Sequence, residues 1–243
     1  MLIVGLTGSI ATGKSTVSSL LSKNHQIPVI DADVLAREVV QPGKPAYQKI
    51  VKHFGSSILL QDGQIDRPAL GRIVFSNAKE RKVLNEITHP AVAKEIAWMC
   101  FGYWIRCERI IVLDIPLLLE GPLWMFCGLV VVVGCRPETQ IGRLRHRDSQ
   151  LSQEEAEQRI KSQMSITEKC LLGDSVIWNE VPVKELELEI EKWVCRIRPS
   201  RLCTMITWSP FGIFWGAIIV GWRWTKRLMK FNQSTVPIKG NFV

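Results

Sequence analysis

One segment near the start of the chain has the composition of a phosphate-binding loop. It is a complete GxxxxGK[ST] pattern with a threonine after it: Gly8-Ser9-Ile10-Ala11-Thr12-Gly13-Lys14-Ser15-Thr16. The glycines let the backbone approach phosphate oxygens, and the start of the following helix attracts negative charge. Lys14 supplies an ammonium group for the β- and γ-phosphates, and the Ser15 hydroxyl can bind Mg²⁺. The pattern predicts that residues 8–16 bind a nucleoside triphosphate together with Mg²⁺.

The neighbours of this loop support the same interpretation. The apolar run at residues 2–7 predicts a buried strand that leads into the loop. After the loop, apolar residues at positions 17, 20 and 21 predict a helix that begins at Lys14. A glycine-rich turn with an incidental lysine is the alternative, but such a turn requires neither the strand nor the helix.

Aspartates follow two further apolar runs, at the positions where strands are expected to end. Asp31 and Asp33 follow residues 29–30, and Asp114 follows residues 110–113. A GTPase would need an Asn-Lys-x-Asp motif, which the sequence lacks, and a motor ATPase would need a longer chain. In the remaining class, a small kinase, Asp33 could accept the proton of the acceptor hydroxyl and Asp114 could hold Mg²⁺. The alternatives are a helix-capping role for one of the first two aspartates and a solvated strand end for Asp114.

Several arginines lie at the start of a predicted charged helix, namely Arg136, Arg143, Arg145 and Arg147. Alternate positions of a helix point to different sides, so the last three cannot all face one ligand. One or two of them could cover the triphosphate as a lid and stabilise the transferred charge. His89, which precedes Pro90, is interpreted as a helix-break residue without a chemical role.

Apolar runs alternate with helical patterns along the first 193 residues. Strands are expected at residues 2–7, 29–30, 110–113, 129–133 and 174–177. Helices are expected from residue 14, at 68–107 with a break at Pro90, at 138–164 as two helices around 149–152, and at 185–193. Short, wholly apolar strands between helices are typical of a parallel sheet that is covered on both faces. The sequence therefore predicts an α/β fold with its ligands at the carboxyl ends of the strands.

The net charge of +8 comes from the end of the chain. Residues 193–243 contain eight Lys and Arg and no acidic residue, whereas the first 192 residues are neutral overall. This distribution argues against a nucleic-acid-binding protein, and the 47% apolar content excludes a disordered chain. The seven cysteines include no CxxC pair, which argues against a disulfide scaffold or a structural zinc site and favours a cytoplasmic protein.

Taken in order, these motifs resemble those of the dephospho-coenzyme A kinase family. The resemblance spans residues 1–193 and rests on Gly5-Leu6-Thr7 with the phosphate loop, Ile30-Asp31-Ala32-Asp33, Ala36-Arg37, Val39-Val40, Ile87-Thr88-His89-Pro90, Asp114-Ile115-Pro116-Leu117-Leu118-Leu119-Glu120 and Glu138-Thr139-Gln140. The Asp-Ala-Asp segment and the Pro-Leu-Leu-Leu-Glu segment are particular to this family.

The resemblance implies that ATP, with Mg²⁺, phosphorylates the ribose 3′-hydroxyl of dephospho-CoA to give CoA and ADP. It implies a three-layer P-loop fold, a helical CoA-binding region around residues 62–107 and a lid around residues 138–165. Asp33 would be the base, Lys14 would act on the phosphates, and Arg143 or Arg147 would belong to the lid.

The sequence departs from the family in the segment expected near the adenine. The family's Asp-Asn-Asn-Gly stretch is here Trp178-Asn179-Glu180-Val181, in which only Asn179 agrees, so we expect Asn179 to be the nucleotide contact. Two other functions stay open. One is a kinase for another small molecule or nucleoside, and the other is a catalytically weak ATP-binding protein that its tail recruits to a membrane.

The tail is expected at residues 196–243, after a kinase domain at residues 1–195. Residues 202–222 form a run of 21 uncharged residues between Arg201 and Arg223, which is long enough to span a bilayer as a helix. Four of the nine tryptophans follow residue 200, and Gly212 and Gly216 have the spacing of close helix packing. Two threonines, a serine and Pro210 in the first half of the run argue against a span.

We therefore expect a cytoplasmic kinase whose tail attaches to an intracellular membrane, such as the mitochondrial outer membrane or the endoplasmic reticulum. The alternatives are an exposed or partner-bound segment and a poorly folding variant end. No protein partner follows from the sequence, and no nucleic acid is expected to bind.

Overall fold

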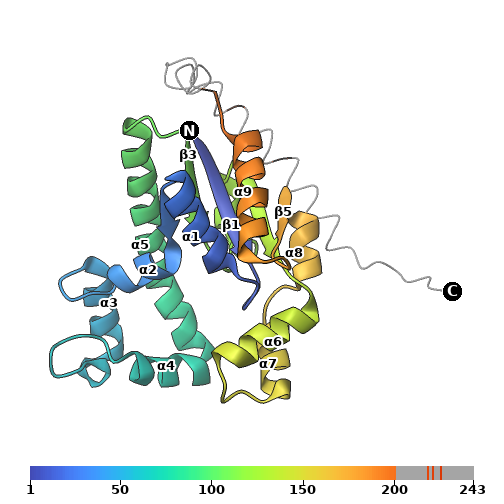
Figure 1. Cartoon of the computed structure of the whole chain (residues 1–243). Coiled ribbons are helices and arrows are strands. Elements are labelled where there is room, and N and C mark those ends of the chain that lie inside the picture. Colours follow the sequence, from blue (N-terminus) through green and yellow to red (C-terminus); the bar gives the residue numbers. More distant parts are fainter. Residues whose placement is uncertain (201–217, 219–220, 222–224, 226–243) are drawn as a thin grey trace. The chain divides into compact units, whose positions relative to one another are not determined.

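The computed structural model describes residues 1–200 together with residues 218, 221 and 225. Within these residues the chain forms two compact units. The sheet unit contains residues 1–29 and the described residues from 107 onward, and the helical unit contains residues 30–106. Figure 1 shows the helices and strands of both units.

Five strands form a sheet in the order β2-β3-β1-β4-β5. They are β1 (Leu2–Gly8), β2 (Val29–Asp31), β3 (Ile110–Asp114), β4 (Leu129–Gly134) and β5 (Ser175–Trp178). The pairs β1–β3, β1–β4 and β4–β5 are parallel, so the predicted α/β fold with a parallel sheet is confirmed. Because β1 lies between β3 and β4, the loop that follows β1 emerges between the carboxyl ends of its two neighbours.

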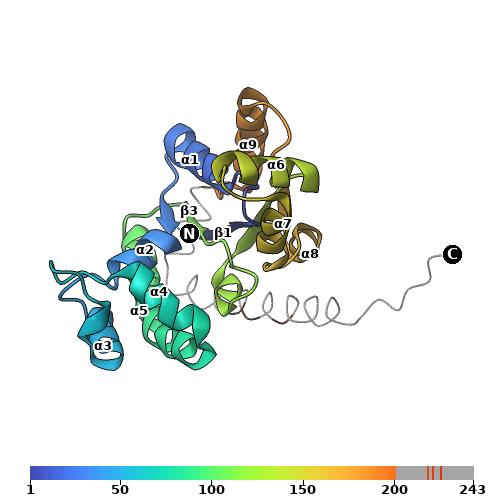
Figure 2. The same ribbon diagram turned by 90° about the horizontal axis from the view of Figure 1, so that it is seen from below.

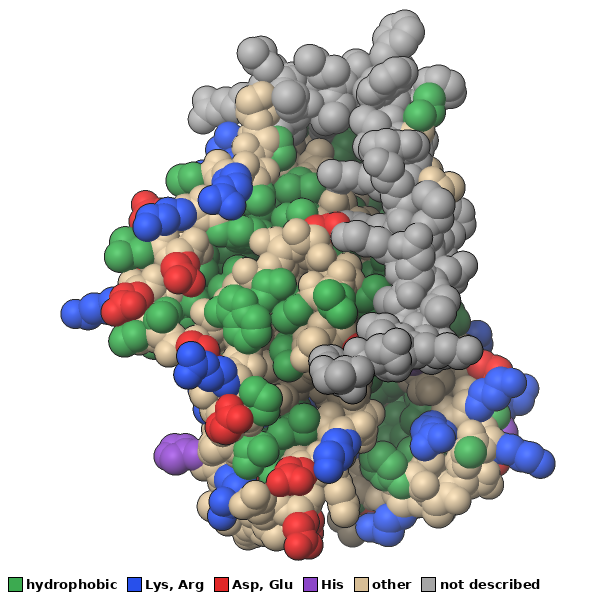
Figure 3. Space-filling model, turned by 90° about the vertical axis from the view of Figure 1, so that its right-hand side faces the viewer, with side chains coloured by type: hydrophobic (Ala, Val, Ile, Leu, Met, Phe, Trp, Pro, Cys, Tyr) green, Lys and Arg blue, Asp and Glu red, His purple; other side chains and the backbone are tan. Residues whose placement is uncertain are grey.

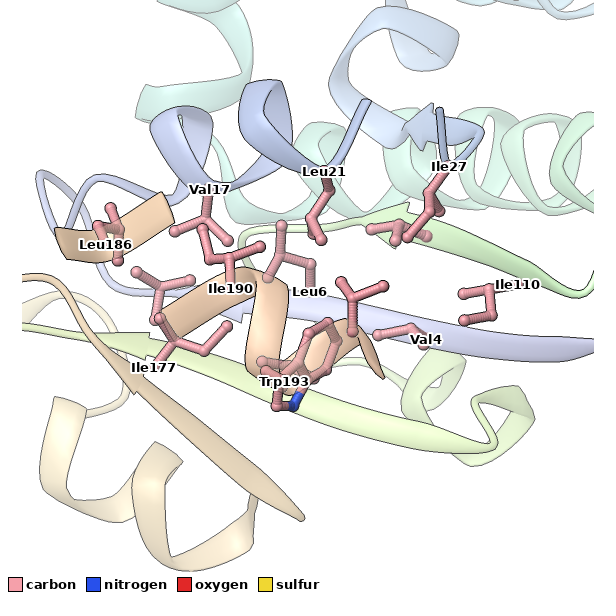
Figure 4. Close-up of a cluster of buried hydrophobic side chains, with 14 residues drawn as sticks. Val4, Leu6, Val17, Leu21, Ile27, Ile110, Ile177, Leu186, Ile190 and Trp193 are labelled. Carbon is pink, nitrogen blue, oxygen red and sulfur yellow. The ribbon is translucent and has the colours of Figure 1, made fainter. Parts of the chain in front are cut away.

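Helices of the sheet unit pack against its strands. They are α1 (Lys14–His25), α6 (Pro137–Arg147), α7 (Gln153–Lys161), α8 (Ile166–Leu172) and α9 (Val183–Ile197), with a 3₁₀ turn at Pro122–Phe126. Figure 4 shows Val17 and Leu21 of α1 and Ile190 of α9 pointing toward Leu6 of β1. Burial of each such side chain contributes about 1.5–3 kcal/mol to folding. This core fixes the start of α1 against the end of β1.

The helical unit has a smaller core of its own. It consists of α2 (Ala32–Glu38), α3 (Pro45–Phe54), α4 (Arg67–Ser76) and α5 (Ala78–Ile105), with a 3₁₀ turn at Ser56–Ile58. The first three helices all contact α5, and Figure 2 shows them around it. Ile50, Ile58, Leu70 and Val74 are buried together in this unit.

The predicted helix break at Pro90 is wrong. Pro90 and His89 lie inside α5, which runs without interruption, and the break falls at Asn77 between α4 and α5. The Asn77 side chain accepts a hydrogen bond of 2.9 Å from the N–H of Lys79 and so caps α5. A proline inside a helix costs about 3 kcal/mol, and the packing of three helices along α5 offsets this cost.

Three helices have no counterpart among the predicted elements, namely α2, α3 and α8. Two of them, α2 and α8, have seven residues each, which is too few for apolar periodicity to be recognised. The local signals that mark them are their caps. Asp31 caps α2, and Ser165 with Glu168 forms a capping box at α8.

The described part of the chain contains no helix that is both long and apolar enough to cross a bilayer. The predicted membrane segment at residues 202–222 lies outside the described residues, except for positions 218 and 221. On the face drawn in Figure 3, acidic and basic side chains of the described residues are interspersed, as the neutral balance of the first 192 residues leads one to expect.

Candidate active site

The segment after β1 is a tight loop that requires glycine at both ends. At Gly8, a Cβ atom would lie 2.8 Å from the carbonyl oxygen of Val133 and 2.7 Å from Oγ1 of Thr12. At Gly13, the backbone has a φ of 84°, and a Cβ atom would overlap the side chain of Asn179. Within the loop, the buried Thr12 hydroxyl donates a hydrogen bond of 2.9 Å to the carbonyl of Ser9. These close approaches form the concave backbone turn that binds phosphate in such loops.

The first turn of α1 follows the loop directly, because the helix begins at Lys14. No side chain among the described residues caps this helix, and its first turn contains no acidic residue. The unpaired N–H groups and the positive end of the helix dipole therefore favour a bound anion. The predicted nucleotide-binding residues 8–16 thus form one continuous loop and helix start.

Lys14 and Asp114, which the sequence places 100 residues apart, form an ion pair. The side chain of Lys14 is 17% exposed and that of Asp114 is 5% exposed, so both charges are largely removed from water. The register of β1 and β3 explains the contact, since Asp114 lies opposite Leu6, just before the loop begins. The hydroxyl-bearing Ser15 follows Lys14 on the first turn of α1.

Asn179, directly after β5, holds the loop from another side. Its buried side-chain amide donates a hydrogen bond of 3.0 Å to the carbonyl of Thr12. Arg143 of α6 donates through Nη2 to the carbonyl of Asn179 at 2.9 Å. The Nη1 atom of Arg143 is buried and makes no hydrogen bond to any described residue. It lies 3.7 Å from the point that a Cβ atom would occupy at position 13. The guanidinium group of Arg143 therefore lies beside the loop with one donor atom that the described residues do not use.

Replacing Asn179 with aspartate removes the donor to Thr12. We expect the variant to lose about 1–3 kcal/mol of folding free energy, because a buried carbonyl is left unpaired. ATP binding is expected to weaken as the loop loses this anchor. Urea unfolding and calorimetric ATP titration measure the two effects, and Asn24→Asp on the exposed side of α1 is the matched control. Unchanged stability and affinity in Asn179→Asp would contradict the anchoring role.

The two aspartates near the end of β2 have different positions. Asp31 caps α2, since its carboxylate accepts hydrogen bonds from the N–H groups of Asp33 at 2.8 Å and of Val34 at 3.1 Å. Asp33 lies in the first turn of α2, in the helical unit, and is exposed. The capping interpretation therefore applies to Asp31, and Asp33 is the candidate base of the two.

The two candidate lid arginines have different surroundings. Arg143 contacts the segment beside the loop, as described above. Arg147 lies at the end of α6, where its 57% exposed side chain pairs with Asp148 at 3.3 Å, and Asp148 also pairs with Arg159. An exposed pair of this kind contributes at most about 1 kcal/mol. The structure thus brings Lys14, Asp114, Arg143 and Asn179 to one loop and places Arg147 in a separate surface network.

Glu180, one of the residues that depart from the family pattern, binds the start of α6. Its carboxylate accepts hydrogen bonds from the N–H of Arg136 and from Oγ1 of Thr139, the latter at 3.0 Å. The hydrogen bond from the Arg136 backbone is the main cause that lowers the pKa of Glu180, and the Thr139 hydrogen bond and nearby arginine charges add to it. This residue therefore connects the segment after β5 to the start of α6.

The lowered pKa of Glu180 predicts a pH-dependent contribution to stability. A carboxyl group whose pKa is lower in the folded state stabilises the fold above its ordinary pKa, and this contribution is lost as the pH falls through the folded-state value. We expect Glu180→Gln to be less stable than the wild type at neutral pH, with a difference that shrinks toward zero in acid. Urea unfolding at both pH values tests this, with Glu189→Gln on the exposed side of α9 as control. A difference that does not change with pH would contradict the assignment.

Three residues that contact or support the loop are absent from the sequence-based prediction of the site: Gln140, Gln163 and Lys169. Gln140 and Gln163 bind the backbone of Ile10. Lys169 is fully buried and pairs with Glu120 at 3.0 Å. Gln140 is part of the Glu138-Thr139-Gln140 motif, but the sequence assigns no role to it, and nothing near Gln163 in the sequence indicates its contact with Ile10. A buried lysine is recognised only when its surroundings are known.

The described residues contain no group of three or more His, Cys, Asp or Glu side chains that could hold a metal ion. A Mg²⁺ ion that arrives with ATP needs fewer protein ligands, because phosphate oxygens and water complete its coordination. Ser15, next to Lys14 in sequence, and Asp114, next to it in space, fit this limited set of oxygen donors.

Comparison with known proteins identifies the family of the chain. The family model described as dephospho-CoA kinase matches residues 2–185. The chain is similar to dephospho-CoA kinase CAB5 of Saccharomyces cerevisiae, with 43% identity over 242 residues, 96% of this chain and 98% of that protein. It is also similar to a dephospho-CoA kinase of Bacillus cereus, with 47% identity over 195 residues, 79% of this chain and 96% of that protein.

A solved structure of a dephospho-CoA kinase also has a similar fold. Dephospho-CoA kinase from Campylobacter jejuni is similar with a TM-score of 0.63 and 29% sequence identity, over 81% of this chain and 96% of that one. The region that the family model matches includes the phosphate loop, Asp33, Asp114 and Asn179. The chain therefore belongs to the dephospho-CoA kinase family.

Proposed function

We propose that the phosphate loop at residues 8–16, Asp33, Asp114 and Arg143 carry out phosphoryl transfer in this chain. The reaction follows from the family: the chain is a dephospho-CoA kinase that uses ATP and Mg²⁺ to phosphorylate the ribose 3′-hydroxyl of dephospho-CoA. The observation that best supports the assigned roles is the ion pair of Lys14 with Asp114 beside a loop that Asn179 anchors.

In the proposed step, the 3′-oxygen of dephospho-CoA forms a bond to the γ-phosphorus while the bond from that phosphorus to the bridging oxygen of ADP breaks. Asp33 accepts the proton that the hydroxyl loses. The loop N–H groups, Lys14 and the unpaired Nη1 of Arg143 donate to the phosphates and stabilise the charge that develops on them.

Ser15 and Asp114 are the residues that would hold Mg²⁺. When it is bound with ATP, the ion supplies charge neutralisation at the β- and γ-phosphates. Asp114 would then have two tasks, because its carboxylate also orients the ammonium group of Lys14. The side chain of Asp114 is almost fully buried, which keeps its position defined.

The helical unit has a pocket that we propose for the acceptor. The pocket has a volume of about 300 Å³, and its lining residues come from the end of α2 through α3 and from the middle of α5. Lys44, Lys49 and Lys94 lie on it beside apolar side chains, together with Glu86 and Glu95. Ammonium groups suit the pyrophosphate of dephospho-CoA, and the apolar wall suits its pantetheine arm. The proposal extends the expected CoA-binding region from residues 62–107 to α3.

An acceptor panel tests the proposed function. The full chain is incubated with ATP and Mg²⁺ and with dephospho-CoA, a nucleoside or a polyol, and ADP release is measured. We expect turnover of dephospho-CoA at a rate at least about a hundredfold above that of the other acceptors. Turnover of another acceptor with none on dephospho-CoA would overturn the assignment. ATP binding without turnover on any acceptor would favour a catalytically weak ATP-binding protein.

We further propose that the tail after residue 195 attaches a cytoplasmic kinase to an intracellular membrane. The support is the run of 21 uncharged residues between two arginines. The similarity to the yeast protein covers 96% of this chain and so must continue past residue 200, whereas the similarity to the Bacillus protein covers 79%. That continuation argues against a poorly folding variant end.

Cell fractionation of the full chain and of a chain that ends at residue 200 tests the attachment. The match covers 96% of the Bacillus relative and 79% of this chain, so we expect the shorter chain to keep kinase activity, which ADP release with dephospho-CoA checks. We expect the full chain in the membrane fraction after a high-salt wash and the shorter chain in the supernatant. The same distribution for both chains would contradict the proposal.

A further inference from the structure

The peptide backbone of Ile10, inside the phosphate loop, is held by two glutamine side chains. Its N–H donates to Oε1 of Gln163 at 3.0 Å, and its carbonyl accepts from Nε2 of Gln140 at 2.7 Å. Gln140 lies on α6 and Gln163 follows α7, so both belong to the expected lid. In Figure 1, α6 and α7 lie at the end of the sheet unit toward which β1 points.

The two glutamines have opposite chemical roles. A backbone N–H can only donate and a carbonyl can only accept, so the partners determine the orientation of both amides. Gln163 therefore acts as an acceptor and Gln140 as a donor. A substitution that preserves one of these capacities and removes the other distinguishes the two positions.

The loop has a conformation that needs external support. Ala11, the residue after Ile10, has a φ of 61°, in the left-handed region that residues other than glycine rarely adopt. Backbone of this kind persists only where surrounding contacts hold it. Hydrogen bonds on both polar groups of the preceding residue supply such contacts.

The segment that carries Gln163 is itself anchored. The N–H of Met164 donates to Oε1 of Glu120 at 3.3 Å, and the Ser9 hydroxyl donates to the carbonyl of Met164 at 3.3 Å. Glu120 in turn pairs with Lys169, whose side chain is 0% exposed. A chain of contacts thus links the buried Lys169, through Glu120 and Met164, to the phosphate loop.

We propose that Gln140 and Gln163 are positioning residues that keep the phosphate loop in its ATP-binding shape. Gln140 is 2% exposed, so water cannot readily replace its hydrogen bond to Ile10. Both residues act through the backbone of the phosphate loop, so their loss is expected to affect ATP affinity before acceptor affinity. The inference rests on ATP binding to this loop, which the wild-type chain tests separately.

The matched pair Gln140→Glu and Gln163→Glu tests the proposal, because each variant adds one negative charge near the loop. Glutamate at 163 keeps the acceptor for the Ile10 N–H, whereas ionised glutamate at 140 has no hydrogen to donate. We expect the Kd for ATP, measured by calorimetry on the full chain at about pH 8, to rise about tenfold to a hundredfold more in Gln140→Glu. The KM for dephospho-CoA is expected to stay within about threefold of wild type in both.

Three further variants make the result decisive. Gln140→Met and Gln163→Met each remove a hydrogen bond without adding charge, and both are expected to weaken ATP binding. Gln158→Glu, on the exposed side of α7, adds the same charge elsewhere on the lid and is expected to bind ATP like the wild type. Thermal unfolding is used to check that each variant folds. If Gln140→Glu does not fold, the ATP affinities of the two methionine variants test the proposal instead.

Equal losses of ATP affinity in the two glutamate variants would overturn the proposal. A parallel loss of dephospho-CoA affinity would also overturn it, because it would indicate a general disturbance of the fold. If the wild-type chain itself bound no ATP, the proposed function of the loop would be wrong. That outcome is distinguishable from a failure of the positioning proposal, in which the wild type binds ATP and the variants do not differ.

Discussion

Lys14→Ala is expected to lower kcat/KM for the kinase reaction about a hundredfold to a thousandfold, as removal of a preorganised donor to a developing charge does in other enzymes. The variant loses the ammonium group that we propose acts on the phosphates. It also leaves the buried carboxylate of Asp114 without its ion-pair partner. Removing one partner of a buried pair costs about 3–5 kcal/mol of stability. Activity and stability are therefore expected to fall together.

A double variant separates the two effects. In Lys14→Ala with Asp114→Asn, no uncompensated carboxylate is left, so stability should recover toward the wild type while activity stays lost. Lys23→Ala, on the exposed last turn of α1, is the control that should behave like the wild type. Urea unfolding and ADP release provide the measurements. A Lys14→Ala variant that kept more than about a tenth of the wild-type rate would contradict direct action of Lys14 on the phosphates.

Asp33→Asn is expected to lower kcat at least about a hundredfold with little change in the Kd for ATP. Asparagine preserves the shape of the side chain but cannot accept the proton of the acceptor hydroxyl. The matched control is Asp31→Asn, because an asparagine oxygen can still accept from the N–H groups of Asp33 and Val34 and cap α2. The control is expected to keep nearly full activity.

The comparison of the two aspartate variants distinguishes chemistry from structure. Full activity in Asp33→Asn would show that Asp33 is not the base. Equal losses in both variants would show that the start of α2 must be intact, without a specific proton transfer at position 33. Initial rates and ATP titrations on the same preparations give both answers.

The elements that could be predicted from the sequence are those that local patterns determine. β1, β3 and β4 are runs of apolar residues that become buried on both faces of the sheet. A helix on the surface would need polar residues on one side, which these runs lack. The phosphate loop depends on glycines at two positions and a lysine, all within eight residues. The sequence also indicates a helix cap at one of the two aspartates 31 and 33, although α2, the helix that Asp31 caps, is not among the predicted elements.

The parts that could not be predicted depend on contacts between distant residues. Gln163 binds Ile10 from 153 positions away, and Asn179 binds Thr12 from 167 positions away. No local pattern contains such a contact. The prediction at Pro90 failed for a related reason, because helices packed along α5 outweigh the tendency of a proline to end a helix.

The position of the transferred phosphate tests the central claim most directly. The full chain is incubated with ATP, Mg²⁺ and either dephospho-CoA or its 3′-deoxy analogue, and the products are identified by mass spectrometry and phosphorus NMR. We predict equal amounts of ADP and of CoA that carries a 3′-phosphate, with no ADP release above background for the analogue. Phosphorylation of the 3′-deoxy analogue, or ADP release without formation of CoA, would contradict the assignment of this chain as a kinase for the 3′-hydroxyl of dephospho-CoA.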